Sequence, residues 1–190
     1  LTNPIADLLL PVGEAVNASK LVWFARRSRV IHHGVPVQEM RTWIKNSRQE
    51  ISSMRGYYAP NKEDLALLYC SRLEIEKGIF QLLDALEVGK LEAIRLGVVG
   101  SGSLSELVQF RIDSSEYLSR HVSFMGPKLE GWKWIASADV LVLPSFHEGL
   151  GVVFMECLAT GTPVLASDIE SVRDIISQKV SGVLVPAGNV

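Results

Sequence analysis

The sequence predicts an α/β fold, a doubly wound parallel sheet of Rossmann type, on two observations. From about residue 62 onward, short aliphatic runs alternate with segments of helical periodicity. The aliphatic runs are nearly continuous in Val, Ile and Leu, which is typical of parallel strands covered by helices on both faces. Ligands of such sheets bind beyond the carboxyl ends of the strands, so we expect the functional residues there.

Six segments are predicted as strands because each is short, aliphatic and bounded by turn residues. In chain order these strands cover residues 65–71, 94–100, 121–126, 139–145, 162–167 and 182–186. Five segments between them show the apolar spacing of helices. In chain order these helices cover residues 78–90, 103–120, 128–138, 151–161 and 169–179.

The chain divides into three parts. Residues 1–35 repeat the strand–helix–strand pattern once (ADLLLPVG, ASKLVWFA, RVIHHGV), which indicates a short remnant of another domain. Residues 36–62 are polar with weak helical periodicity, and we interpret them as a connector. Residues 63–190 form the main domain and stop soon after a predicted strand, so we expect the chain to be cut at both ends.

Composition restricts the partners and the compartment. The chain has 190 residues, 47% hydrophobic, with a net charge of −2, so it lacks the basic excess of a nucleic-acid-binding protein. Its first residues lack a basic signal-peptide region, and no run approaches the roughly 18 apolar residues of a membrane span, so we expect a cytoplasmic protein. Cys70 and Cys157 lie in apolar runs and are predicted to be reduced core residues.

Chemically distinctive residues follow four of the predicted strands. They are Arg72 and Lys77 after the first, Gly100 and Gly102 after the second, Gly126 after the third, and His147, Glu148, Gly149, Leu150 and Gly151 after the fourth. Each alone also fits a tight turn or a solvated loop. Together, two cations, glycine amides and helix N-termini at one sheet edge suit a diphosphate. No carboxylate or cysteine stands at ligand spacing from the adjacent His32 and His33, so we expect no metal.

Glu148 and Glu156 are the two carboxylates of this region. Eight residues on a helix separate them by about 12 Å, whereas hydrolase carboxylate pairs lie about 5 to 10 Å apart. The spacing disfavours a catalytic dyad. Glu156 stands among apolar residues, where a sugar diol could supply two hydroxyl donors to it, as ribose does in dinucleotide folds. A surface position for Glu156 and a helix-dipole role for Glu148 are the alternatives.

Several ordered motifs carry a resemblance to a known family. They are SRLEIEKG, VVGSGSL, VSFMGP, ADVLVLPSFHEGLGVVFMECLATGTPVLASD and SGVLVP. Over residues 65–188 the chain resembles the C-terminal donor-binding domain of retaining GT-B glycosyltransferases of family four (glycosyl transferases group 1). Glu148 and Glu156 stand at the E-x7-E spacing of that family, and RVIHHGVP resembles the segment where the chain leaves the acceptor domain.

The resemblance implies a role for each candidate residue. Arg72 and Lys77 would neutralise the donor diphosphate, Glu148 would meet the transferred sugar and Glu156 would hold the nucleotide ribose. The remaining residues would line the donor cleft: Gly100 and Gly102 at the glycine turn, Met125 and Gly126 near the base, and His147, Gly149, Leu150 and Gly151 beside the sugar and phosphates.

The resemblance also implies an activity: transfer from a UDP- or GDP-linked sugar, with retention and without metal or cofactor, to a glycan or lipid-linked acceptor, as in polysaccharide biosynthesis. We expect the chain alone to bind donor but transfer poorly, and the full-length enzyme could associate peripherally with a membrane. Ser101, His33 and Asp174 depart from the residues the family often has at these places. A non-catalytic nucleotide-sugar binding module and another GT-B enzyme, such as a sugar-nucleotide epimerase, are the alternatives.

Overall fold

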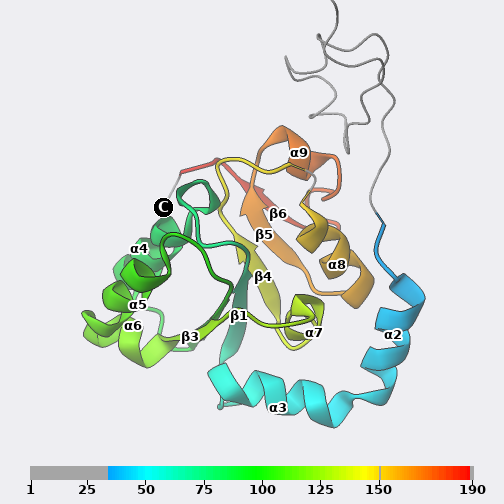
Figure 1. Ribbon diagram of the computed structural model, residues 1–190, viewed down its shortest axis with the longest axis horizontal. Coiled ribbons are helices and arrows are strands. Elements are labelled where there is room, and N and C mark those ends of the chain that lie inside the picture. Colours follow the sequence, from blue (N-terminus) through cyan, green and yellow to red (C-terminus); the bar gives the residue numbers. More distant parts are fainter. Residues whose placement is uncertain (1–33, 150, 189–190) are drawn as a thin grey trace, which may run out of the picture.

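The computed structural model describes residues 34–149 and 151–188, and these residues form one parallel sheet with helices on both faces (Figure 1). All strand pairs are parallel, and the strand order is β3-β2-β1-β4-β5-β6. The strands are β1 (Leu65–Cys70), β2 (Ile94–Val99), β3 (Val122–Gly126), β4 (Val140–Leu143), β5 (Val164–Ser167) and β6 (Gly182–Val185). Each lies within one of the predicted segments, which confirms the predicted fold class.

The helices divide between the two faces of the sheet. On one face α4 (Ile79–Gly89) contacts α6 (Glu116–His121), and α5 (Ser105–Asp113) and α6 contact β3. On the other face lie α7 (Gly131–Ile135), α8 (Val152–Thr160) and α9 (Glu170–Arg173) (Figure 1). Because crossover connections are right-handed, the helices change face where the direction of strand addition reverses, between β3 and β4.

Three predicted helices differ from the structure. The segment 128–138 forms only the five residues of α7. The segment 103–120 forms α5 and α6 instead of one helix, because Ser115 starts a new helix by accepting a hydrogen bond from the amide of Leu118. The segment 169–179 forms only the single turn of α9.

The segment 36–62 is helical and packs on the domain. It forms α2 (Val37–Asn46), which contacts α8, and α3 (Arg48–Tyr58), which contacts α7 and β2. Met40 and Tyr58 are buried. The predicted connector therefore contributes to the core. The predicted remnant domain in residues 1–33 lies outside the described residues.

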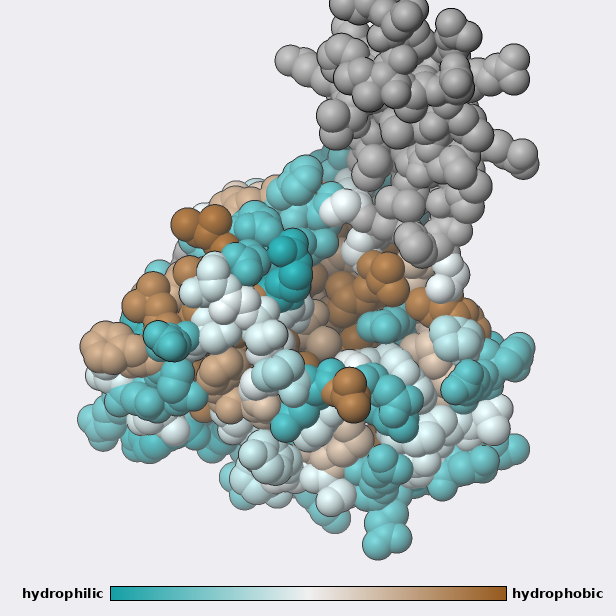
Figure 2. Space-filling model, viewed as in Figure 1, coloured by the Kyte–Doolittle hydropathy of each residue, from teal (hydrophilic) through white to brown (hydrophobic). Residues whose placement is uncertain are grey.

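Because strand addition reverses after β3, β4 pairs with β1, and these two strands lie side by side in the middle of the sheet. Such a switch point opens a crevice at the carboxyl ends of the two strands, where α/β sheets bind ligands. The crevice rests on a buried core that includes Leu68, Tyr69, Leu141 and Phe154. Apolar residues also show in the middle of the face in Figure 2, with polar residues around them.

Candidate functional site

The loops that follow β1 and β4 join backbone to backbone at the switch point. The amide of Phe146 donates to the carbonyl of Glu76 at 2.8 Å. Gly78 has a φ of +70°, and a Cβ at this position would lie 2.1 Å from the carbonyl oxygen of Pro144. This close approach requires glycine, and it brings Lys77 beside the loop that carries Glu148.

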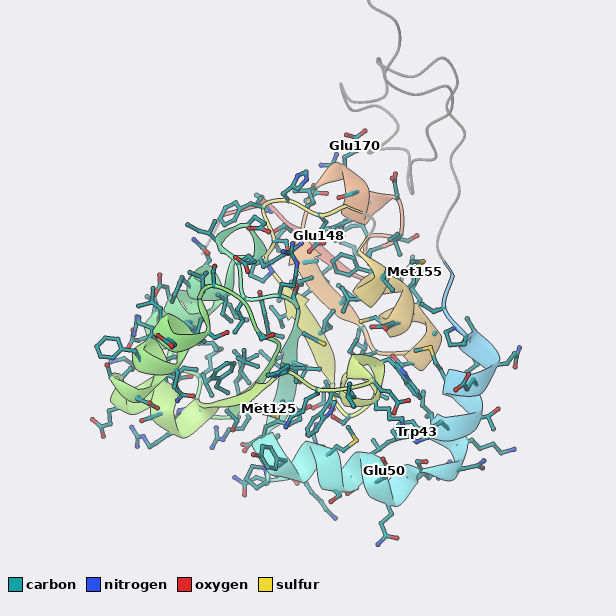
Figure 3. The ribbon with its side chains drawn as sticks, viewed as in Figure 1. Trp43, Glu50, Met125, Glu148, Met155 and Glu170 are labelled. Atoms are coloured by element: carbon teal, nitrogen blue, oxygen red, sulfur yellow. The ribbon has the colours of Figure 1, made fainter. Side chains whose placement is uncertain are left out.

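Lys77 and Glu148 form a buried ion pair between these loops. The Lys77 ammonium lies 2.8 Å from Oε2 of Glu148, and both side chains are 8% exposed. The other carboxylate oxygen accepts a hydrogen bond from the buried Ser145 hydroxyl at 2.8 Å, and Lys77 also donates to the carbonyl of His147. Figure 3 places Glu148 among the loops at the upper end of the sheet. Two residues predicted to meet different parts of the donor thus contact each other.

Arg72 and Glu156 face a second feature, an open cavity of about 270 Å³ at the carboxyl ends of β1 and β2. Arg72 is exposed and meets Glu76 at 3.2 Å within its own loop. Gly100, from the glycine turn after β2, also lines the cavity. Lys128, which follows β3, adds a second cation to the wall. A cavity with two cations and one carboxylate matches the charge pattern of a nucleoside diphosphate, which carries an anionic diphosphate and, next to it, a ribose with a diol.

Glu156 lies half-buried on α8, in the wall of this cavity. Burial raises the pKa of its carboxyl group above the usual value. Burial, with the charge of Glu156 second, also raises the pKa of the neighbouring Cys70 thiol to about 12. A half-buried carboxylate beside an open cavity gains from any ligand that supplies hydrogen-bond donors, which fits the predicted ribose contact.

The glycine turn after β2 is tightly held by the protein itself. The amide of Gly100 donates to the carbonyl of Gly126, and the amide of Gly102 donates to the Ser105 hydroxyl. The Glu74 carboxylate accepts hydrogen bonds from the hydroxyl and the amide of Ser103, and these bonds lower the pKa of Glu74. The structure therefore places Gly102 against the loop after β1 and only Gly100 in the cavity wall.

Met125 occupies an irregularity at the end of β3. In the β2–β3 pairing Val98 faces Phe124 and Val99 faces Gly126, so Met125 is the extra residue of a bulge. Its side chain is buried, and its methyl group lies beside Gly97. Sequence reasoning located the end of this strand, but the bulge has no clear sequence signature.

The loop before α8 carries the remaining predicted residues. His147 and Gly149 are exposed, and the space around Gly149 is open. Gly151 has a φ of +60° and precedes the first residue of α8, where the helix presents its amides. Leu150 lies outside the described residues. The open space is therefore at Gly149, whereas a Cβ at Gly151 would lie 2.6 Å from the ring of Phe154.

Three residues of the site were missed by sequence reasoning. Lys128 directly follows the quoted motif FMGP, so its position after a strand end was a usable signal. Ser145 and Tyr69 lie inside aliphatic runs, where a polar residue with a buried side chain needs a partner.

Among residues 34–149 and 151–188, no group of three His, Cys, Asp or Glu side chains is arranged to hold a metal ion. No helix in the same residues is long and apolar enough to cross a membrane.

Known proteins share the sequence pattern of this chain. An uncharacterized glycosyltransferase of Methanocaldococcus jannaschii is 31% identical over 164 residues, which are 83% of this chain and 40% of that protein. The phosphatidyl-myo-inositol mannosyltransferase of Mycobacterium leprae is 37% identical over 122 residues, which are 61% of this chain and 31% of that protein. The chain spans less than half the length of either relative.

A solved structure shares the fold. The crystal structure of HepE from Anabaena in complex with UDP-glucose matches 98% of this chain and 51% of its own chain, with a TM-score of 0.78 and 21% identity. This likeness supports the C-terminal half of the GT-B fold as the architecture of the described sheet. Residues 51–190 match the family described as Glycosyl transferases group 1. The chain therefore belongs to the glycosyl transferases group 1 family.

Proposed function

We propose that residues 63–190 bind the nucleotide-sugar donor of a glycosyltransferase at the carboxyl edge of the sheet. The observation that carries the proposal is the cavity that Arg72 and Glu156 line together. A diphosphate needs a cation and exposed amides, and a ribose diol needs a partly buried carboxylate. HepE contains UDP-glucose in its crystal structure, which favours a UDP-linked donor over a GDP-linked one.

The proposed chemistry is electrostatic. When the bond to the sugar breaks, negative charge grows on the departing nucleoside diphosphate, and preorganised positive groups stabilise it. Arg72 is exposed, and its guanidinium forms a surface ion pair of small energy with Glu76, so it can turn toward the phosphates at little cost. We propose that transfer proceeds with retention and needs neither metal nor cofactor, because Arg72, Lys77 and the start of α8 supply the positive field.

Glu148 has a constrained role in this proposal. Lys77 and the Ser145 hydroxyl hold both of its carboxylate oxygens. A sugar hydroxyl would have to share or replace one of these partners, and a diphosphate would offer Lys77 a second anion. We propose that donor binding exchanges these partners, so that Lys77 faces the diphosphate and Glu148 faces the sugar.

The acceptor is a matter for the full-length protein and not for this chain alone. We propose a glycan or lipid-linked acceptor, bound by the part of the enzyme that corresponds to the N-terminal half of the relatives. The relative from Mycobacterium leprae is named for a phosphatidyl-myo-inositol acceptor, which favours the lipid-linked choice and a peripheral position at a membrane.

Thermal unfolding with added ligands tests the donor site. One series among UDP, GDP and ADP and their sugars should raise the midpoint of this chain, because a ligand that binds only the folded state stabilises it. Glu156→Ala should abolish the shift with the nucleotide, Glu148→Ala should reduce only the extra shift from the sugar, and the exposed Glu116→Ala should leave both intact. No shift with any of these ligands at millimolar concentration would refute the proposal.

A further inference from the structure

Tyr69 lies directly under the loop that carries the two predicted diphosphate cations. It is fully buried near the end of β1. Its hydroxyl lies 3.2 Å from the carbonyl oxygen of Arg72 and 3.4 Å from that of Lys77. One side chain therefore contacts the backbone at both ends of the six-residue segment 72–77, here named the cation loop.

The chemistry of this contact is that of one proton shared by two acceptors. Both distances exceed the usual O–H···O separation of about 2.7–2.8 Å, as expected when a single hydroxyl proton serves two carbonyls. Burial, with the charge of Glu148 second, raises the pKa of Tyr69, so the hydroxyl keeps its proton. It therefore remains a donor, which the two carbonyls require.

The cation loop is also held at its sides. The amide of Leu73 donates to the carbonyl of Ser101, and the carbonyl of Glu76 accepts from Phe146. These bonds tie the loop to its neighbours, whereas Tyr69 reaches the backbone of the two cationic residues from below. Removing the hydroxyl would leave two carbonyl groups, one of them in a buried contact, without this donor.

We propose that Tyr69 is a positioning residue for donor binding: its hydroxyl holds Arg72 and Lys77 at a fixed separation, so that both cations meet the diphosphate. The inference rests on the proposed donor site. It adds a role for a buried residue that does not itself touch the ligand. Loss of the Tyr69 hydroxyl should weaken binding of the phosphates and leave binding of the base and ribose unchanged.

The test compares Tyr69→Phe with Tyr117→Phe in otherwise unchanged chains. Both substitutions keep the ring and remove one hydroxyl. The Tyr117 hydroxyl donates to the carbonyl of Leu91, before β2, at the opposite edge of the sheet. Titration calorimetry with UDP and with uridine separates phosphate binding from nucleoside binding, with GDP and ADP and their nucleosides as further probes. Amide hydrogen exchange of the cation loop is measured without ligand.

We expect Tyr69→Phe to raise the Kd for UDP about three- to tenfold, the effect of one lost hydrogen bond. The Kd for uridine should stay within twofold, and Tyr117→Phe should change neither. Exchange of the Lys77 and Gly78 amides, which bond within the loop, should become faster only in Tyr69→Phe. A UDP affinity within twofold of the parent chain, or equal losses for UDP and uridine, would overturn the proposal.

The same experiment separates this inference from the proposed function. If the parent chain binds no nucleotide, the donor site fails, and hydrogen exchange alone then decides whether Tyr69 holds the cation loop. Unchanged exchange in Tyr69→Phe overturns the inference even where the parent chain binds UDP.

Discussion

Replacing Lys77 with methionine should destabilise the domain strongly, because it leaves a charge without its partner. The ammonium lies 2.8 Å from the Glu148 carboxylate, and both side chains are 8% exposed. Removing one member of a buried ion pair costs about 3–5 kcal/mol, since the remaining charge stays desolvated. The Ser145 hydroxyl bonds one oxygen of Glu148 and reduces this cost only in part. We therefore expect a loss of about 3 kcal/mol in the free energy of unfolding.

A double substitution tests the physical reason. Lys77→Met combined with Glu148→Gln removes both charges and keeps an acceptor for Ser145. If the uncompensated carboxylate causes the loss, the double variant should recover about 2 kcal/mol relative to Lys77→Met alone. Arg72→Met is the matched control, because its ion pair with Glu76 is exposed and worth about 0–1 kcal/mol.

Urea denaturation followed by circular dichroism at pH 7.5 measures all four chains, with the slope of each transition checked for constancy. A Lys77→Met loss no greater than that of Arg72→Met would refute the buried pair. Equal stabilities for Lys77→Met and the double variant would show that the charge left on Glu148 is not the cause.

Three further substitutions or reactions follow from the site. Burial raises the pKa of Glu156, so its ionisation opposes folding as pH rises above the usual value of 4.5. Glu156→Gln should therefore be more stable than the parent chain at pH 7.5. In urea titrations this difference in the free energy of unfolding should disappear below pH 4.5. Gly78→Ala should lower the free energy of unfolding by about 3 kcal/mol, because the strain of a left-handed φ adds to a clash with Pro144. Gly126 also has a left-handed φ but open space around it, so Gly126→Ala should lower the free energy of unfolding by only about 1–2 kcal/mol. The pKa of Cys70, which lies half-buried in the cavity wall, is raised to about 12, so this thiol should react with iodoacetamide at pH 8 much more slowly than an ordinary thiol, as followed by mass spectrometry. An equal rate would contradict the raised pKa.

The sheet was predictable because its strands are buried on both faces. Aliphatic runs such as residues 65–71 and 94–100 have the length of buried strands, and they alternate with longer segments of helical spacing. The helices of residues 36–62 were harder to predict, because most of their residues are exposed and only a few, among them Met40 and Tyr58, enter the core. Tertiary packing stabilises those helices, and a single sequence does not show it.

The sequence indicates the sheet edge at which the candidate residues lie but not their contacts. Arg72 follows β1 and Glu156 lies on α8, and both line one cavity. The pairing of Lys77 with Glu148 joins two loops that are far apart in sequence, and no spacing rule predicts it. The hydrogen bonds of the Tyr69 hydroxyl could not be predicted either, because an aliphatic run indicates a core position whether or not one of its residues carries a hydrogen-bonded hydroxyl.

The place where a nucleotide binds decides whether the cavity lined by Arg72 and Glu156 is the donor site. Amide chemical shifts of the isotopically labelled chain, followed by nuclear magnetic resonance during titration with UDP and GDP, map the contact surface residue by residue. We expect the shifts to gather at the carboxyl ends of β1 to β4, around Arg72, Gly100, Lys128 and Glu156. Shifts confined to the groove between α2 and α8, or no shifts with either nucleotide at millimolar concentration, would contradict it.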